Sequence, residues 1–572
     1  MSNPTVTTES SRGACLRAAL ILNAVLLALA VILVRVAFES NDDQTLAAFV
    51  DGQMAHSTPY IPYIHVALGW ALKLIYDTLG RDTAWHTLCQ YALLYAGLTA
   101  LCFAVSARVG ALRGAAVSAV LLLFFGVDVY CVISYTKTAA VCTVGGMALL
   151  LDAAGTAQRR TLTRALGVLL ALFGFMLRPM EFLPCFAIMA ALGLRPLWDL
   201  LTAGTGAAEK LRRLARLIRP FALVLILAAG LYAVNERAWS REPWKTYHAF
   251  DKIRVDYSDY GRPAYGDMPG AYAKLGLSRA DVQLLYNGDY FDPETFSADV
   301  MRRITEARET NFPPPTAGEC VGLLLDRAIP GFFGNLPVYG LLLALCLWLA
   351  AGEHGARDWL GLACAAALFA LAYLYLIYRG RYLVARADLG LLLALAAAPA
   401  LTLDAEKLRR ERVLTVLLLL LAVITSHYLT RDSYRSAEAE DRSAARAACE
   451  TLLQDEEHVY LAKLDAVADG LWSPFEPCAR GYWDKIVLLG GFDCLHPSVM
   501  ENLARYGVEN PYRDCVGNAR VRLIDNDITL TLQFIHEHYD PAARAERVDA
   551  LSDATGLEIY RILRGEARRE TS

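Results

Sequence analysis

The sequence lacks a strong charge of either sign, internal repeats and low-complexity segments beyond Ala/Leu-rich stretches. Its 55 Lys and Arg residues nearly balance its 59 Asp and Glu residues, and the formal net charge is -4 at pH 7. Chains that bind nucleic acid usually carry basic runs or patches. This balance therefore argues against nucleic acid as a partner. The cysteine spacing matches no zinc site.

The chain is instead rich in long apolar runs. Hydrophobic residues make up 55% of its 572 residues, and the mean hydropathy is +0.32. The excess lies in blocks of roughly 20 residues, the length that a helix needs to cross a bilayer. We predict a polytopic α-helical membrane protein with about eleven transmembrane helices. The spans are expected at 16–37, 86–107, 114–133, 138–154, 163–178, 181–195, 219–236, 331–351, 359–378, 384–403 and 413–429.

The basic loops predict the orientation of these spans. Short loops rich in Lys and Arg stay on the cytoplasmic side. Three such loops begin at Ala157, Glu209 and Glu406, and all three fall inside if the N-terminus is cytoplasmic. No small-residue cleavage pattern follows the first apolar run, so we expect it to be a retained span and not a signal peptide.

Three regions are then expected outside the membrane: residues 38–85, residues 237–330 and the tail. We divide the chain into a transmembrane domain, 1–429, and an extracytoplasmic C-terminal domain, 430–572. The apolar stretch from Ile61 carries tyrosines, a tryptophan and a lysine, which suits a helix lying on the membrane surface. Counting this stretch as a span would move every later loop to the opposite side of the membrane and place the basic loops outside the cytoplasm.

The tail alternates short apolar runs with a helical pattern, which predicts a small α/β domain. Its four cysteines, Cys449, Cys478, Cys494 and Cys515, allow three disulfide pairings or none. In the second outer region, Ser278 and Asp281 have the spacing of a capping box.

Acidic residues stand where the first span ends. Asp42 and Asp43 follow it directly, with Glu39 just before them. Acids at this place either start a helix, where they are favoured, or supply a catalytic carboxylate at the water–lipid boundary. We expect Asp43, with Asp42, to act as the general base, and the sequence leaves open which of the two takes the proton.

Several cations are predicted at the same outer ends of spans, where the charge rule predicts few. A Lys or Arg at membrane depth usually has a partner or a function, although such side chains also extend to headgroups. A lipid phosphate is one suitable partner. The candidate donor-phosphate ligands are Lys137, Arg178, Arg379, Arg381 and Arg386.

With the acids facing the sugar, this arrangement suits glycosyl transfer. A carboxylate would take the proton of an acceptor hydroxyl while cations stabilise the departing lipid phosphate. The pattern resembles the GT-C superfamily of membrane glycosyltransferases, which use polyprenyl-phosphate sugars. The residues that carry the resemblance are "NDDQTLAAFVDGQ", "SYTKTAAV", "MLRPMEF", "RVDYSDYGRPAYGD", "LGLSRADVQLLYNGDYFDPETF" and "YRGRYLVAR". The chain looks most like a branch of uncharacterised bacterial multi-span proteins.

The resemblance implies a place and a reaction. The protein would lie in the bacterial inner membrane and move a sugar to an envelope glycan or glycolipid. A divalent cation is used by some members of the superfamily, but two aspartates are too few ligands to argue for a metal. The candidate sugar or acceptor ligands are Asp256, Tyr257, Asp259, Tyr260 and His56. A packed loop explains the Tyr- and Asp-rich stretch equally well, and His56 also fits an ordinary interfacial residue.

Two other classes of protein remain open at this point. A transporter or flippase for lipid-linked sugars should carry ionisable groups deep within its spans, and few are seen there. A non-enzymatic assembly protein would act through its outer tail.

Overall fold

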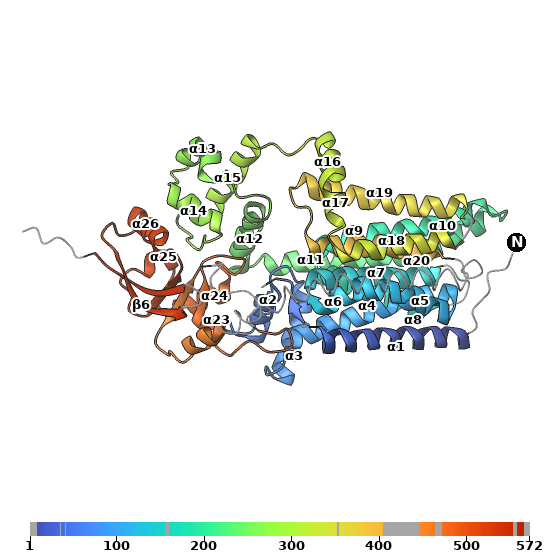
Figure 1. Cartoon of the computed structure of the whole chain (residues 1–572), viewed down its shortest axis with the longest axis horizontal. Helices are drawn as coiled ribbons and strands as arrows, with labels where there is room; N and C mark the ends of the chain where they lie inside the picture. The colour runs from blue at the N-terminus through green and yellow to red at the C-terminus, as the bar shows by residue number, and fades with distance from the viewer. Residues whose placement is uncertain are drawn as a thin grey trace, which may run out of the picture.

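The computed structural model of the chain describes residues 9–34, 36–40, 42–154, 160–351, 354–403, 446–463, 472–552 and 557–565. A long helical bundle forms one end of the molecule, and a mixed domain forms the other (Figure 1). Helix α1 (Glu9–Leu33) begins at the far end of the bundle, away from the mixed domain.

The bundle consists of long apolar helices and a few short breaks. Its elements are α1 (Glu9–Leu33), α4 (Trp85–Val109), α5 (Ala111–Leu121), η1 (Leu122–Gly126), α6 (Val127–Cys131), α7 (Tyr135–Ala154), α8 (Thr161–Leu177), α9 (Pro179–Ala190), η2 (Ala191–Gly193), α10 (Leu194–Thr202), α11 (Ala207–Trp239), α16 (Ala317–Leu323), η4 (Leu324–Ala328), α17 (Ile329–Phe332), α18 (Leu336–Ala350), α19 (Ala356–Tyr378) and α20 (Ala385–Thr402).

Eight helices in the described part of the chain are long and apolar enough to cross a membrane, and a ninth arises if α16–α17 and α18, bent by 93°, count as one span. The apolar helix α8 is shorter. The prediction of a multi-span helical membrane protein is confirmed. Ten of the eleven predicted segments coincide with these helices, and the eleventh, 413–429, lies outside the described residues.

Small residues let two central helices approach closely. A Cβ atom on Gly145 of α7 would lie 2.2 Å from the carbonyl oxygen of Gly97 on α4. Lipid tails are as apolar as the helices, so the hydrophobic effect does not drive helices together within a bilayer. They associate through close packing of this kind instead. The α4–α7 contact therefore fixes the centre of the bundle.

We expect Gly145→Ala to destabilise the protein by roughly 1–3 kcal/mol, because the new methyl group would push α4 and α7 apart. Thermal unfolding in detergent measures the change. Gly230→Ala on α11 is the matched control, since a Cβ there meets nothing within 4 Å. Equal melting temperatures for the two variants would contradict the close approach.

Most described residues of the three regions predicted outside the membrane lie together at the other end of the bundle (Figure 1). Helices α16 and η4, within the predicted region 237–330, instead belong to the bundle. The first contains α2 (Asp42–Asp51) and α3 (Val66–Leu79), and the second contains α12 (Trp244–Asp259), η3 (Tyr265–Asp267), α13 (Pro269–Lys274), α14 (Arg279–Asn287) and α15 (Ala298–Asn311). The predicted surface helix corresponds to α3, which is not among the candidate spans. Ser278 and Asp281 form the predicted capping box at the start of α14.

The tail forms the predicted α/β domain. Its sheet has the strand order β4-β3-β5-β7-β6. Strand β3 (Val459–Ala462) pairs in parallel with β4 (Ile486–Leu488) and β5 (Val521–Asp525), while β7 (Leu557–Leu563) runs antiparallel to β5 and to β6 (Arg544–Ser552). The helices are α23 (Tyr482–Lys485), α24 (Pro497–Ala504), α25 (Pro511–Asp514) and α26 (Ile528–His538). Strands β3 and β4 are buried along their whole length, as expected of parallel strands covered on both faces.

The tail shares one hydrophobic core with the two outer loops. The same cluster of buried side chains contains Phe49 of α2, Phe250 of α12 and Leu461 of β3. Backbone contacts cross the regions too, as when the Phe291 N–H donates to the Leu489 carbonyl at 2.9 Å. Regions far apart in sequence therefore form one packed unit at the end of the bundle.

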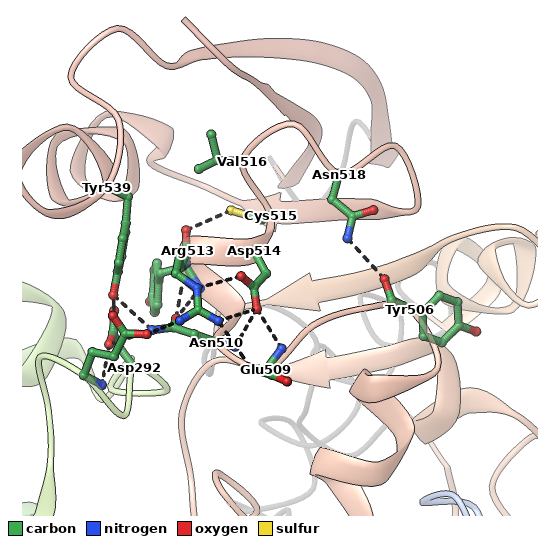
Figure 2. A network of polar contacts seen from close by, with 12 residues as sticks. Asp292, Tyr506, Glu509, Asn510, Arg513, Asp514, Cys515, Val516, Asn518 and Tyr539 are labelled. Atoms are coloured by element: carbon green, nitrogen blue, oxygen red, sulfur yellow. Dashed lines mark hydrogen bonds and ion pairs between the residues drawn. The ribbon is translucent and has the colours of Figure 1, made fainter.

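A buried polar contact ties the tail to the second outer region (Figure 2). The Asn510 side-chain amide donates to Asp292 and to the Tyr539 hydroxyl, at 3.0 Å each, and the Tyr539 hydroxyl donates to Asp292. Asp292 is buried, so these donors satisfy a carboxylate that would otherwise be costly to bury.

The four tail cysteines are unpaired in the structure. Cys449, Cys494 and Cys515 are buried and Cys478 is partly exposed. The sequence left open three disulfide pairings or none, and the structure has none among these four cysteines.

Candidate active site

The acidic pair begins α2 at the junction between the bundle and the outer unit. The two-residue strand β1 (Ala37–Phe38) precedes it and pairs in parallel with β2 (Val132–Ile133), which follows α6. This pairing holds the end of the first span beside the start of α7. Asp42 and Asp43 occupy the first turn of α2, where the helix dipole favours negative charge.

Asp43 is completely buried. Its Oδ1 accepts a hydrogen bond from the Gln90 amide at 2.7 Å and another from the Tyr135 N–H at 3.1 Å. Burial raises the pKa of Asp43 to about 7, and the hydrogen bond from Gln90 opposes that shift. Asp43 therefore joins α2, α4 and α7, and it ionises close to neutral pH.

The raised pKa predicts a pH-dependent stability. The folded chain keeps the Asp43 proton up to about pH 7, whereas an unfolded chain releases it near pH 4. Ionised Asp43 therefore lowers the stability of the fold, and this loss develops as the pH rises from about 4 to 7. We expect Asp43→Asn, which mimics the protonated acid, to match wild type near pH 4 and to be more stable at pH 8 by up to about 4 kcal/mol.

Thermal unfolding of both proteins across this pH range measures the difference. Asp82→Asn is the control, because Asp82 is highly exposed and should leave the pH profile unchanged. A pH profile of Asp43→Asn that runs parallel to wild type would contradict the buried, raised-pKa carboxyl.

Asp42 is the more accessible of the two acids, with 20% of its side chain exposed. Its Oδ2 lies 3.4 Å from Nη1 of Arg386, in the first turn of α20. The same guanidinium donates to the Ser40 hydroxyl at 3.2 Å. The carboxylate also lies within electrostatic range of the Arg178 guanidinium. Arg386 thus contacts the acid directly, and Arg178, the other predicted phosphate ligand, acts on it only at longer range.

Arg178 is placed by a break between two helices. Helix α8 ends at Leu177 and α9 begins at Pro179, because a residue before proline is driven to an extended conformation. The guanidinium donates to the Tyr135 hydroxyl. It lies 5.1 Å from the ring centroids of both Tyr63 and Tyr135. The two rings hold the cation in place by cation–π contact.

Tyr63 has a strained backbone, with a φ of 65°. A bulky residue in the left-handed region is uncommon, and such strain gathers at functional sites. Its hydroxyl accepts a hydrogen bond from Arg254 at 2.5 Å. Tyr63 therefore connects Arg178 with α12 of the second outer region.

Lys137 is buried at the start of α7 and already has three acceptors. Its Nζ lies 2.6 Å from Asp128, 2.9 Å from Glu39 and 3.1 Å from the Val132 carbonyl. An ammonium group has three N–H donors. Lys137 thus binds the segment before α2 to α6.

The two arginines after α19 pair with acids of α12. Arg379 lies 3.0 Å from Asp256, and its guanidinium carbon is 4.0 Å from the Tyr260 ring centroid. Arg381 lies 2.5 Å from Asp259. The structure therefore joins four of the predicted ligands into two ion pairs, with Tyr260 against one of them.

Two predicted ligands lie elsewhere. Tyr257 is buried in the core of the outer unit, which agrees with the packed-loop alternative. His56 is half-exposed and forms an ion pair with Glu501 at 3.1 Å.

Sequence reasoning missed Tyr63, Tyr135 and Gln90. Tyr135 stands two residues before Lys137, inside a motif that had already been singled out. A buried glutamine and a tyrosine with positive φ carry no sequence signal of their own, so the structure was needed to find them.

Among the described residues, one group of three side chains is arranged to hold a metal ion: Asp281, Glu537 and His538. It lies between α14 and α26, and Asp281 there is already engaged as the cap of α14. No such group includes Asp42 or Asp43 in the part of the chain that the structure describes.

These features define a polytopic helical membrane protein with an acid–arginine site where its bundle meets a large extramembrane unit. No family model matches the chain, and no curated protein does. Among solved structures, the crystal structure of ArnT from Cupriavidus metallidurans bound to undecaprenyl phosphate is similar over 95% of this chain and 97% of that one, with 11% identity and a TM-score of 0.37.

Proposed function

We propose that this protein is a membrane glycosyltransferase that moves a sugar from a polyprenyl-phosphate donor to an envelope glycan or glycolipid. The observation that carries the proposal is the part-exposed Asp42 carboxylate, held 3.4 Å from Arg386 with Arg178 beside it. An acid that accepts a proton and cations that bind a phosphate are the two groups that such a transfer needs. Asp42 lies in the first turn of α2 and Arg386 in the first turn of α20.

Asp42 is the better candidate for contact with the acceptor, because Asp43 is fully buried. In the proposed step the acceptor hydroxyl oxygen forms a bond to the anomeric carbon, and Asp42 takes the hydroxyl proton. The bond between that carbon and the phosphate oxygen breaks, and polyprenyl phosphate leaves. Asp43 holds the first turn of α2 in place through Gln90 and Tyr135.

The guanidinium groups of Arg178 and Arg386 would neutralise the leaving phosphate. Arg178 is held by two tyrosine rings, so little of its freedom remains to be lost on binding. Lys137, already paired with Asp128 and Glu39, would hold the segment before α2 in place.

Arg379 and Arg381 would supply a second set of phosphate contacts. A donor phosphate would compete with Asp256 and Asp259 for the same guanidinium groups. The carboxylates and the Tyr260 ring released in this way would be available to a sugar.

Turnover of a defined donor tests the proposal. The full chain in lipid nanodiscs is incubated with a panel of polyprenyl-phosphate sugars and an envelope lipid extract, and free polyprenyl phosphate is measured. We expect release from one donor. Binding of no donor would overturn the proposal. Movement of a lipid-linked sugar across a vesicle bilayer without its hydrolysis or transfer would favour a transporter instead.

A further inference from the structure

Helices α16, η4 and α17 form one continuous helical segment, Ala317–Phe332, that meets the apolar helix α18 at 93°. The bend falls at Asn335, whose backbone is extended, with φ -109° and ψ 131°. Figure 1 shows α16 and α17 running across the long direction of the bundle. Because α18 packs among the spans, the segment Ala317–Phe332 runs parallel to the membrane plane.

Large apolar side chains are exposed along one side of this segment and recur every four residues. Val321, Leu325, Ile329 and Phe333, which follows the segment directly, are 40% to 56% exposed. Residues four apart lie on the same face of a helix, so these four form one apolar stripe. A contiguous exposed apolar surface usually marks a contact with another protein or with lipid.

A second side of the segment packs on the bundle. Phe332 is buried, and its ring centroid lies 4.8 Å from that of Tyr373 on α19. A Cβ atom on Gly331 would lie 2.7 Å from Cδ2 of Leu383, in the turn that follows α19. The segment is therefore held against α19, and the apolar stripe is not its packing face.

The third side of the segment is charged. Glu319, Asp326 and Arg327 are exposed, and by their positions in the helix they stand away from the apolar stripe. A helix with one apolar and one charged exposed side suits the boundary between lipid and water.

The length of α18 gives the depth at which the segment lies. At about 1.5 Å per residue, the 15 residues of α18 cover roughly 22 Å. The apolar core of a bilayer is about 30 Å thick. Surface helices bury their apolar face about 5–10 Å into the boundary layer, which makes up the length that α18 lacks.

The neighbouring helix shows that lipid reaches this place. Helix α19, on which the segment packs, exposes Leu371, Tyr375 and Tyr378 along its last turns. Such side chains on a membrane-spanning helix face lipid, and tyrosines are enriched at the membrane–water interface. The apolar stripe thus continues a surface that lipid already covers.

We propose that the segment Ala317–Phe332 lies flat in the membrane interface and that its apolar stripe contacts the acyl chains of one leaflet. The segment is then not the outer half of a ninth span. This assignment does not depend on the proposed function.

The depth of spin labels in a bilayer tests the proposal. The full chain is reconstituted in phosphatidylcholine vesicles with a nitroxide on an encoded p-acetylphenylalanine, because its 13 cysteines would compete for a thiol label. The label replaces Val321, Leu325 or Ile329 in turn. Collision rates with oxygen, which concentrates in lipid, and with a nickel chelate, which stays in water, are measured by electron paramagnetic resonance.

We expect oxygen collisions to exceed nickel collisions at all three positions, with the same ratio at each. A label at Val548 of β6, which is apolar and 52% exposed, is the matched control and should collide mainly with nickel. A label at Leu371 of α19 provides the lipid reference.

Three results would overturn the proposal. Mainly nickel collisions along the stripe would place it in water. Low rates with both reagents would mean that protein covers it. A ratio that changes in steps from Val321 to Ile329 would indicate a segment that crosses the membrane, since four residues advance about 6 Å along a helix.

Discussion

Asp42→Asn is expected to reduce donor turnover by roughly 10²- to 10⁴-fold, the usual contribution of a general base. The substitution preserves the size of the side chain but removes the group that takes the acceptor proton. It also removes the negative partner of Arg386, which lies 3.4 Å away. Release of polyprenyl phosphate by the full chain in nanodiscs measures the effect, with donor binding recorded in parallel.

Asp82→Asn provides the control for this prediction. Asp82 lies in the same outer loop but has 92% of its side chain exposed, and it pairs only with Arg480 in the described contacts. Its loss should leave turnover unchanged. Asp43→Asn should lower turnover less than Asp42→Asn, because Asp43 supports α2 from a buried position. Full activity in both single variants at the pair would reject the proposed base.

Arg178→Lys is expected to lower kcat/KM for the donor by roughly 10- to 150-fold. The value corresponds to a charge-assisted hydrogen bond of about 1.5–3 kcal/mol. Lysine keeps the charge but loses the planar fork that matches phosphate oxygens and stacks on aromatic rings. Steady-state kinetics with varied donor concentration measures the change.

A second arginine tests whether the loss is specific. Arg216→Lys alters a half-exposed residue in the basic segment that begins α11, near Glu209. It should behave as wild type. If Arg178→Lys also retained wild-type kcat/KM, the donor phosphate would have to bind elsewhere, and the pairs formed by Arg379 and Arg381 would be the next candidates.

The helical bundle could be predicted from sequence because a bilayer imposes its own length on apolar segments. The same reasoning correctly separated α3 from the spans, since its tyrosines and its lysine suit a surface position. The α/β tail was also predictable, because short apolar runs and a helical pattern alternate there. The shared core was not, since its contacts join Phe49 with Leu461 across most of the chain.

The sequence predicted which residues lie at the candidate site, but it did not predict which of them contact one another. Sequence placed Asp42, Arg178 and Arg386 at one membrane face, yet it gave no means to tell which cation meets which acid. Their pairing depends on how α2, α9 and α20 pack. The role of Asp43 depends on burial, which a charged residue at a span end does not reveal. The strain at Tyr63 likewise follows from tertiary contacts alone.

The common core of the outer unit has a consequence for how the protein is made. Residues of α2 are translated early, but the strands that share their hydrophobic core are translated much later. Contacts of such long sequence separation form slowly, and the exposed intermediate is prone to aggregate. The hydrophobic core around the N-terminal helix α2 therefore cannot be completed until the tail has been synthesised. A nascent protein that lost its last hundred residues would leave the apolar side chains of α2 without part of their core, and quality-control proteases would act on this exposed surface.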